Sequence, residues 1–371
     1  MKINIRKNQF LNSLNIVSKA LPNNTTYPIL ECILIDATKK NIILTTTDSE
    51  ISIKTILDGE IEEPGKIAIE GKFLYDIIKG MPESEDNILL KVDNNNNCKI
   101  SSGKIVNKFI GKNAEDFPNI TNYSKEKFIK ISEYLLKKMI EKSLIAVSRD
   151  KKETRIISKG VYVVVDKDKI TFNALDSYKM AIINQKLNEQ YEKMTTFIPG
   201  TTLDELLKII KGDIDKEVKI YFNDNNVTFE LNNTILISRI IDSKYVDIKN
   251  FINKEYNTKV TVNRKDLIES LERTNPYIYN VERKPVNLEI KDEELTISLQ
   301  SIRGDYKDEL KIVKNGNDLL IPFNQEQLNS ILKVIDDEEI TMYFNLSKDP
   351  LVIKDLKENY LYLIMSFTNS K

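Results

Sequence analysis

Residues 198–210 read Ile-Pro-Gly-Thr-Thr-Leu-Asp-Glu-Leu-Leu-Lys-Ile-Ile and predict an amphipathic helix. The Pro-Gly turn precedes Thr202, which we expect to be the N-cap, and the two acidic residues that follow would lie in the first turn. Apolar residues then recur every three or four positions from Leu203 to Ile210. This one-sided spacing is typical of a helix that packs on a sheet.

The same pattern occurs twice more in the chain. Residues 69–80 read Ile-Glu-Gly-Lys-Phe-Leu-Tyr-Asp-Ile-Ile-Lys-Gly, and residues 321–335 read Ile-Pro-Phe-Asn-Gln-Glu-Gln-Leu-Asn-Ser-Ile-Leu-Lys-Val-Ile. The copies lie roughly 125 residues apart, which is about the size of one small domain. We therefore predict three copies of one unit, which we place at residues 1–121, 128–246 and 247–371.

Each copy has the same order of elements. An amphipathic helix opens it, strands follow, the helix described above comes next, and further strands close it. Because the connections are mostly of hairpin length, we expect an α+β fold of antiparallel sheets with the helices on one face. The predicted opening helices are residues 8–21, 132–147 and 264–274, and the predicted strands include residues 29–35, 42–46, 51–56, 88–92, 98–101, 105–110, 160–165, 169–174 and 178–183.

The composition provides no global basic field. The 371 residues include 55 Lys and Arg against 56 Asp and Glu, and 41% of the residues are apolar, which is enough for each unit to have its own core. Any contact with a nucleic acid would therefore depend on local clusters of basic side chains and not on the net charge of the chain.

Histidine is absent, and the chain has only two cysteines, Cys32 and Cys98. This composition excludes His-based general acid–base catalysis, Ser-His-Asp and Cys-His nucleophiles and nearly all zinc sites. Each cysteine is expected to be a small core residue. We predict no disulfide framework, no metal site and no cofactor.

We expect neither a signal peptide nor a membrane span in this sequence. The N-terminal Met-Lys-Ile-Asn-Ile-Arg-Lys lacks the apolar core of a signal peptide, and no apolar run approaches the length of a membrane span. We therefore expect a soluble cytoplasmic protein with no membrane partner.

Several short phrases occur in the order and spacing of one known family. Together with the threefold plan, they resemble the bacterial DNA polymerase III beta subunit, the sliding clamp, over essentially the whole chain. No single phrase is diagnostic, but their order and spacing together are specific. The phrases are Tyr27-Pro-Ile-Leu30, Thr47-Asp-Ser49, Ala114-Glu-Asp-Phe-Pro-Asn-Ile120, Thr154-Arg155, Ala174-Leu-Asp-Ser177, Ile198-Pro-Gly200, Ser238-Arg-Ile240 and Tyr362-Leu-Ile-Met365.

The resemblance implies a DNA clamp fold and a non-catalytic function. Two three-domain protomers would join head to tail as a homodimer, forming a ring with helices inside and sheet outside. Duplex DNA would pass through the hole independently of its sequence. The DNA polymerase III alpha subunit, the clamp loader and other proteins with a clamp-binding motif would dock on the ring, which acts as the processivity factor of replication.

A ring that slides contacts phosphates without reading bases, so lysine and arginine are the expected contacts. The loop from Arg149 to Arg155 corresponds to a family segment near the hole, whereas a basic residue common in the family's first loop is replaced here by Asn24. Exposed helix lysines also serve solubility alone. The candidate DNA-facing residues are Arg149, Lys151, Lys152, Arg155, Lys72, Lys79, Lys137, Lys138, Lys142 and Lys208, with Lys7, Lys19, Lys211 and Arg264 as further cations expected on solvent faces of helices.

The resemblance also implies a hydrophobic pocket between the second and third units, where peptides of the Gln-Leu-x-Leu-Phe kind insert. Ordinary strand packing is the alternative explanation for apolar residues of this type. Several positions depart from the family pattern, among them Leu175 for a usual threonine and Val246 for a usual proline. The candidate pocket residues are Leu175, Ser177, Met180, Val246, Phe251, Leu363 and Met365, with Ser158 expected on the rim.

The dimer contact implied by the resemblance would join residues 107–110 of one protomer to residues 276–279 of the other. Phe109, Ile110, Tyr277 and Ile278 are the candidate interface residues. Closing a ring in this way would also protect an exposed strand edge.

Two alternatives to a standard clamp stay open. The first is a diverged clamp paralogue with altered partner specificity, suggested by Asn24 and the altered pocket residues. The second is an enzyme that reuses the fold. The acidic residues 336–339 follow a helix and are expected to form a solvated face, and no phosphate-binding glycine-rich loop is present, so the second alternative has little support.

Overall fold

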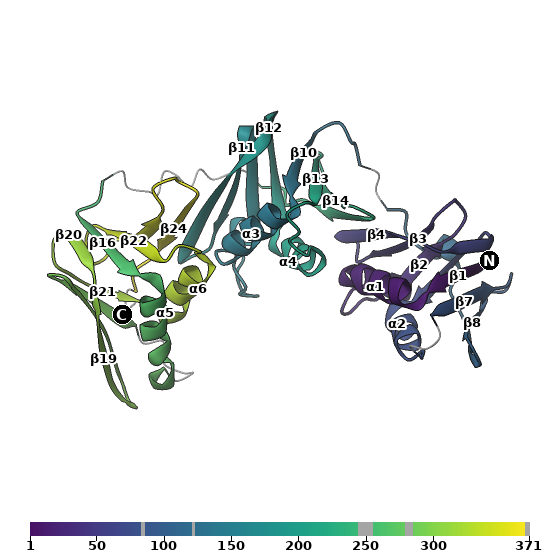
Figure 1. The fold of residues 1–371 in the computed structure, drawn as a ribbon, viewed down its shortest axis with the longest axis horizontal. Coiled ribbons are helices and arrows are strands. Elements are labelled where there is room, and N and C mark those ends of the chain that lie inside the picture. The colour runs from purple at the N-terminus through teal and green to yellow at the C-terminus, as the bar shows by residue number, and fades with distance from the viewer. Residues whose placement is uncertain (83–85, 121–122, 244–254, 279–284, 368–371) are drawn as a thin grey trace. The chain divides into compact units, whose positions relative to one another are not determined.

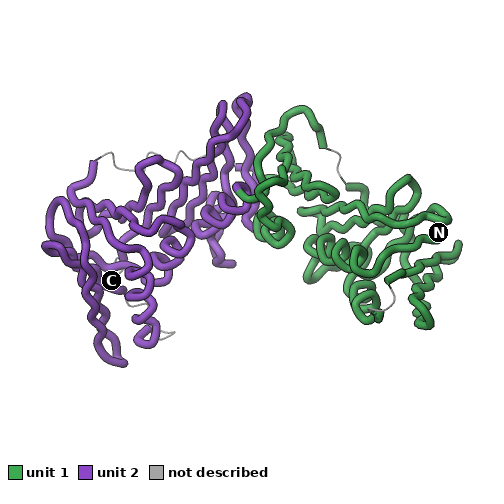
Figure 2. Tube along the Cα trace, in the orientation of Figure 1, with its two compact units in different colours: residues 1–134, 201–240 green, residues 135–200, 241–371 purple. Residues whose placement is uncertain are grey.

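Two compact units make up the structure, a computed structural model of the chain (Figure 2). The first comprises residues 1–134 and 201–240, and the second comprises residues 135–200 and 241–371, so the middle copy of the predicted repeat contributes to both. The residues described are 1–82, 86–120, 123–243, 255–278 and 285–367.

The described residues contain two α-helices for each copy of the repeat (Figure 1). In each copy the second helix follows a strand and buries leucines at the predicted spacing, as with Leu203 and Leu206 in the middle copy. Burial of one such side chain contributes about 2 kcal/mol. The helices are α1 (Lys7–Val17), α2 (Gly71–Lys79), α3 (Glu133–Leu144), α4 (Gly200–Ile209), α5 (Arg264–Arg273) and α6 (Gln325–Val334).

The first unit contains a five-stranded sheet of order β5-β1-β7-β8-β9 and an eight-stranded sheet of order β10-β13-β14-β15-β4-β3-β2-β6. In the larger sheet β15 pairs antiparallel with β4, with Ser238 opposite Ile51, so one sheet runs from the first copy into the second. The strands are β1 (Lys2–Arg6), β2 (Cys32–Asp36), β3 (Ile42–Thr47), β4 (Ile51–Leu57), β5 (Glu60–Glu63), β6 (Lys66–Glu70), β7 (Asn87–Val92), β8 (Asn97–Ser102), β9 (Ile105–Ile110), β10 (Phe128–Ser132), β13 (Glu217–Phe222), β14 (Asn226–Leu231) and β15 (Thr234–Arg239).

The second unit contains a seven-stranded sheet of order β11-β12-β24-β23-β22-β16-β20 and a four-stranded sheet of order β19-β18-β17-β21. Here β12 pairs antiparallel with β24, which joins the second copy to the third. The strands are β11 (Gly160–Leu175), β12 (Lys179–Pro199), β16 (Thr258–Asn263), β17 (Val286–Lys291), β18 (Glu294–Ser301), β19 (Gly304–Lys311), β20 (Val313–Gly316), β21 (Leu319–Phe323), β22 (Glu339–Phe344), β23 (Leu351–Lys354) and β24 (Tyr360–Ile364).

The N-cap predicted at Thr202 is wrong. Helix α4 begins at Gly200, directly after the last residue of β12, so Thr202 lies inside the first turn. Its hydroxyl is buried and hydrogen-bonded to the Ser238 hydroxyl at 2.6 Å. The side chain therefore joins the helix to strand β15 instead of capping it.

Strand lengths differ most from the prediction in the middle copy. The two strands predicted at 160–165 and 169–174 are one strand, β11, whose register shifts between Val165 and Lys169. The polar residues at this irregularity resemble a turn when the sequence is read locally. The strand predicted from residue 29 begins only at Cys32, because residues Pro28–Glu31 form a 3-10 turn.

Both cysteines are buried and free, as the sequence predicts. Burial raises the pKa of both thiols, to about 11 for Cys98. Lys7 was expected on the solvent face of its helix, and that expectation is wrong. Its side chain is buried and its ammonium donates to the Met81 carbonyl oxygen at 2.5 Å, which ties α1 to the end of α2.

Candidate functional site

An apolar cluster at one end of strands β12 and β24 brings together several of the predicted pocket residues. Met180 and Leu363 are opposite one another in the register of these strands, and both are buried. Leu175 pairs with Met180 from strand β11 and packs against the cluster while only partly buried. These side chains form an apolar floor within the second unit.

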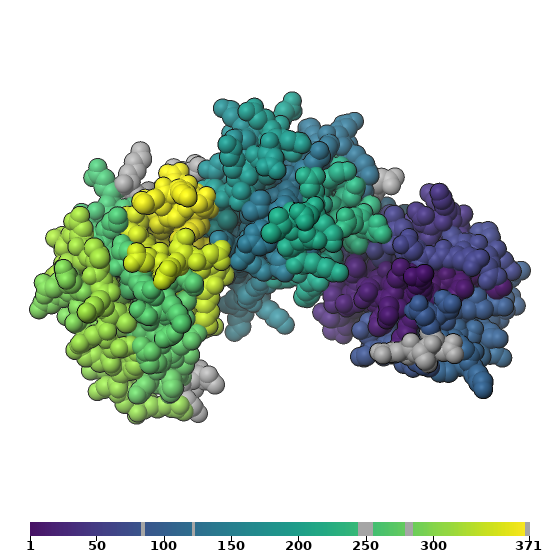
Figure 3. Space-filling view, in the orientation of Figure 1, coloured from purple at the N-terminus to yellow at the C-terminus, as the bar shows by residue number. Residues whose placement is uncertain are grey.

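Met365 lies at the open end of this floor. It follows β24, its backbone N–H donates to the Tyr178 carbonyl oxygen at 2.8 Å, and its side chain is 42% exposed. The C-terminal residues, coloured yellow, lie on the surface of the unit in Figure 3. An exposed methionine beside an apolar floor is suited to contact an apolar ligand, because its thioether chain adapts to different shapes.

The cluster includes residues that the sequence analysis missed. Ile182 and Val352 are buried in it, and Leu361, Tyr256 and Tyr343 pack against it. The missed signal is the period of two along β12 and β24, which places Ile182 on the same face as Met180 and Leu361 on the same face as Leu363.

The structure does not place three predicted pocket residues in this floor, one because it is buried elsewhere and two because they are not described. Ser158 was expected on the rim, but it is fully buried and its hydroxyl has no hydrogen-bond partner among the described residues, so the rim prediction is wrong. Val246 and Phe251 lie outside the described residues.

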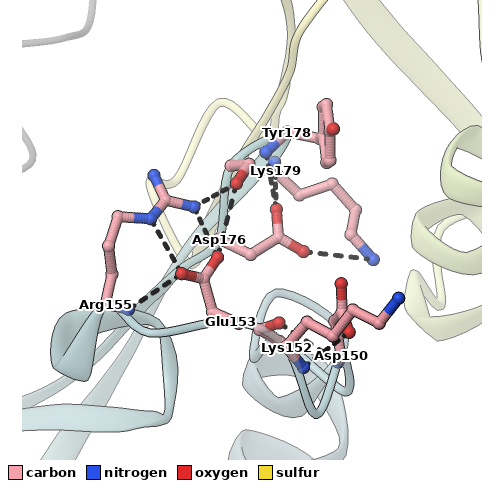
Figure 4. A network of polar contacts seen from close by, with 9 residues as sticks. Asp150, Lys152, Glu153, Arg155, Asp176, Tyr178 and Lys179 are labelled. Carbon is pink, nitrogen blue, oxygen red and sulfur yellow. Dashed lines mark hydrogen bonds and ion pairs between the residues drawn. The ribbon is translucent and has the colours of Figure 1, made fainter.

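A polar cluster joins the loop after α3 to the turn between β11 and β12 (Figure 4). The Arg155 guanidinium donates both to the Glu153 carboxylate, at 2.6 Å, and to the Ser177 hydroxyl. These hydrogen bonds and the arginine charge lower the pKa of Glu153 to about 2. Ser177, predicted to line the pocket, is therefore held by a charged pair next to Leu175.

The turn itself is fixed by Asp176. Its carboxylate accepts from the backbone N–H groups of Tyr178 and Lys179, both at 2.7 Å. The Lys179 ammonium donates to the Ile145 carbonyl oxygen at 2.6 Å, and burial lowers its pKa. The turn is thus attached to the end of helix α3 before any ligand binds.

Three of the predicted DNA-facing lysines are exposed on the second helices of the first two copies. Lys72 and Lys79 lie on α2, where the Lys79 ammonium is 5.9 Å from the centre of the Tyr75 ring. Lys208 lies on α4 and pairs with Glu205 at 2.7 Å. Exposed pairs of this kind contribute little to stability, so these cations stay available to an anionic ligand.

Two lysines of α3 form ion pairs with one exposed carboxylate of the same chain. Lys138 and Lys142 form ion pairs with Asp336 at 3.2 and 2.9 Å, and only 18% of the Lys142 side chain is exposed. Partial burial acts to raise the pKa of Asp336, but hydrogen bonds and charge from both lysines lower it overall. Residues 336–339 are exposed, as expected of a solvated acidic face, and the Asp336 carboxylate is in addition bound by both lysines.

The loop that follows α3 carries the remaining predicted cations. Lys151 and Lys152 are exposed, whereas Arg155 is engaged at the polar cluster of the pocket. Arg149 is exposed, and Lys137 on α3 is partly exposed; both have interacting neighbours. Asp150 is interleaved with these cations and accepts from the backbone N–H of Lys152, so the loop is less basic than its lysines and arginines alone suggest.

Outside this set, Arg264 was expected to face solvent. Its guanidinium donates to the carbonyl oxygens of Asp337 and Leu332 at 2.7 and 3.2 Å. It therefore satisfies carbonyl groups near the end of α6, a common use of arginine at a helix C-terminus.

The residues predicted for a dimer contact lie near free sheet edges. Strand β9 is an edge of the five-stranded sheet, where Ile110 is 76% exposed and Phe109 packs edge-on against Phe73 with ring centres 5.1 Å apart. Tyr277 and Ile278 are half-buried, next to α5. The sequence analysis missed β19, which is an edge of the four-stranded sheet.

No group of three or more Cys, Asp or Glu side chains is arranged to hold a metal ion within the described part of the chain. No helix among the described residues is long and apolar enough to cross a membrane.

Family models match the chain in three consecutive segments. They are the N-terminal, central and C-terminal domains of the DNA polymerase III beta subunit, at residues 1–121, 130–247 and 249–367. The chain belongs to the DNA polymerase III beta subunit family. Members of this family are sliding clamps, non-catalytic processivity factors of DNA replication that act with DNA and a polymerase.

Similar proteins and structures agree with this membership. The chain is 31% identical over 365 residues to the beta sliding clamp of Staphylococcus epidermidis, covering 95% of both chains. A crystal structure of a DNA polymerase III beta subunit from Eubacterium rectale is 32% identical, with a TM-score of 0.96 and complete coverage of both chains. The DNA polymerase sliding clamp from Bacillus subtilis is 28% identical, with a TM-score of 0.95 over 100% of this chain and 99% of the other. The clamp fold and the sliding-clamp function predicted from the sequence are therefore confirmed.

Proposed function

We propose that two copies of this clamp join head to tail around duplex DNA and hold the replicative polymerase on its template in the cytoplasm. The match to sliding clamps along nearly the whole chain is the observation that carries this proposal. Within the chain we place the three clamp domains at residues 1–121, 128–246 and 247–371. A closed ring needs no chemistry, because the topological link alone keeps a bound polymerase near the DNA.

The dimer is proposed to form through strand edges. Unpaired backbone groups along β9 in one copy and β19 in the other would extend a sheet across the contact, as an exposed edge tends to do. Phe109 and Ile110 from one copy would meet Tyr277 and Ile278 from the other. Sedimentation velocity tests this contact: Ile110→Asp is expected to shift the dimer to monomer, and an unchanged dimer would contradict it.

DNA is proposed to bind through phosphate contacts from the exposed lysines of α2, α4 and the loop after α3. Contacts of this kind carry no sequence information and weaken steeply with salt. Lys138 and Lys142 would contribute less than their charges suggest, since Asp336 already neutralises part of their field.

The apolar floor is proposed as the docking site for partner peptides of the Gln-Leu-x-Leu-Phe kind. Leu175, Met180 and Leu363 would receive the leucine and phenylalanine side chains, and Met365 would cover them from the open end. The observation in support is that an adaptable, exposed methionine lies beside buried apolar strand residues at a single site.

A fluorescent Gln-Leu-x-Leu-Phe peptide tests the docking site by anisotropy. We expect micromolar binding, about −8 kcal/mol, that Met365→Asp abolishes. The matched control is Leu356→Asp, which alters an apolar side chain of the same unit that is 88% exposed and outside the cluster. Equal loss of binding in both variants would argue against the assignment.

A diverged clamp with altered partners is the second candidate. The polar cluster of Arg155, Glu153 and Ser177 favours it, because it adds a charged wall beside an otherwise apolar site. Absence of peptide binding by a folded dimer would support this candidate, whereas ordinary affinity for the host polymerase would count against it.

A further inference from the structure

A row of lysines crosses the five-stranded sheet of the first unit, whose strands β1, β7 and β8 are visible in Figure 1. The strand register places Lys2 opposite Lys91, Lys91 opposite Lys99, and Lys99 opposite Lys108. Four successive strands thus present an ammonium group at the same level. Like charges directly opposite one another destabilise a sheet, so the row costs the fold stability.

The last three lysines of this row point to solvent. Lys91, Lys99 and Lys108 are exposed, whereas Leu90 and Ile100, their neighbours along the strands, are fully buried on the other face of the sheet. The row therefore lies on the solvent face of the sheet and not in its core.

No carboxylate among the described residues forms an ion pair with Lys91, Lys99 or Lys108, although Lys2 is paired with Glu62. Asp93 lies nearby, but its carboxylate accepts from the backbone N–H groups of the following turn at 2.8 and 2.9 Å. Lysine on an edge strand is a known protection against edge pairing. Edge protection accounts for Lys108, which lies on the edge strand β9. It does not account for Lys91 and Lys99, which lie on interior strands.

The three lysines line a shallow hollow of about 480 Å³. Its wall also includes the Asp93 carboxylate and the apolar side chains of Phe109 and Ile110. With three lysines against one aspartate, the hollow carries net positive charge.

We propose that this lysine row binds a helix of a partner protein through Asp or Glu side chains on one face of that helix. The spacing supports a helix: three adjacent strands place the ammonium groups over about 9.6 Å, at ~4.8 Å per strand. Residues i, i+4 and i+7 of a helix lie on one face and span about 10.5 Å, at ~1.5 Å per residue.

This interaction is separate from the proposed ring and from the apolar peptide floor. The row lies on the solvent face of a sheet, whereas the lysines proposed to contact DNA lie on helices or on the loop after α3. It uses the exposed lysine side chains of the row, whereas the proposed dimer uses the backbone edge of β9 together with the Phe109 and Ile110 side chains. A variant that no longer binds the partner helix but still forms the dimer would therefore report on the lysine row alone.

The test uses a fluorescent alanine-based peptide of about 20 residues, long enough to be partly helical, with Glu at i, i+4 and i+7. Anisotropy is measured with the full chain at low salt. We expect saturable binding that weakens about tenfold or more in Lys91→Gln/Lys99→Gln/Lys108→Gln, as expected for the loss of several charge contacts. The control is Lys39→Gln/Lys40→Gln/Lys348→Gln, which removes the same charge from other exposed positions and should leave affinity within about twofold.

Three results would overturn the proposal. The first is equal affinity of the row variant and the control. The second is equal binding of a peptide of the same composition with its Glu residues scrambled, which would remove the argument from helical spacing. The third is tighter binding of a single-stranded oligonucleotide through the same lysines, which would make the row a nucleic-acid site. Circular dichroism of the row variant is expected to match wild type, since the change relieves like-charge repulsion.

Discussion

Leu363 and Met365 lie two residues apart and are expected to respond differently to truncation. Leu363 is 5% exposed, so Leu363→Ala removes about three buried methylene-sized groups, worth about 2.4 kcal/mol at ~0.8 kcal/mol per group. The cavity left behind raises the expected loss to about 3 kcal/mol. Met365 is 42% exposed, so Met365→Ala should cost no more than about 1 kcal/mol.

Scanning calorimetry of the full chain measures the difference. In a unit of this size, a loss of 3 kcal/mol lowers the Tm of the transition by about 6–12 °C, whereas 1 kcal/mol lowers it by about 2–4 °C. At a temperature where both variants are folded, Met365→Ala should still weaken the Gln-Leu-x-Leu-Phe peptide by about tenfold, or 1.4 kcal/mol. The physical reason is that Met365 touches the ligand more than it touches the core.

Two outcomes would refute this reasoning. An unchanged Tm for Leu363→Ala would mean that Leu363 is not part of a packed floor. Equal Tm losses in the two variants, with unchanged peptide affinity for Met365→Ala, would mean that Met365 belongs to the core and not to the binding surface.

Three further predictions follow from charges in the structure. Asp336→Asn should raise DNA affinity about two- to threefold at low salt, because the carboxylate no longer neutralises part of the positive charge of Lys138 and Lys142. Equal affinity of the variant and the wild type in a filter-binding assay would count against this. The double change Lys151→Gln/Lys152→Gln should make the slope of log K against log salt shallower by about 1.8 if both contact phosphates, and an unchanged slope would place them away from the DNA. The carboxylate of Glu153 should titrate near pH 2 by NMR, since its pKa is depressed to about 2 from its ordinary 4.5; its ion pair stabilises the fold above pH 4.5 and is lost as pH falls towards 2. A midpoint near 4.5 would show that the pair does not form.

The helices were the most predictable part of the fold. Helices α2, α4 and α6 all lie within the three stretches whose apolar period predicted a helix, because burial of one face is encoded locally. The Thr202 cap failed because a distant strand competes for the same hydroxyl: Ser238 takes the hydrogen bond that a capping role would have used. The residues next to Thr202 in the sequence do not reveal that a distant strand offers its hydroxyl another hydrogen-bond partner.

Charged side chains were harder to predict than apolar ones. Lys7 and Arg264 occupy polar positions of amphipathic helices, yet both donate to carbonyl oxygens of segments far away in the chain. Helical periodicity predicts which side of a helix a residue occupies. It does not predict whether a neighbouring element covers that side, since this depends on packing between segments distant in sequence.

The sequence by itself determined the threefold repeat, the antiparallel α+β class, the buried cysteines and the family, because periodicity and short phrases in order are properties of the chain alone. Only the tertiary structure decided which strand edges meet, as in β15 with β4 and β12 with β24, and therefore which apolar residues form one floor. It also decided that Lys91, Lys99 and Lys108 form one row. Register between strands depends on the packing of their buried faces, and a single residue of slip would have turned those lysines to the other side of the sheet.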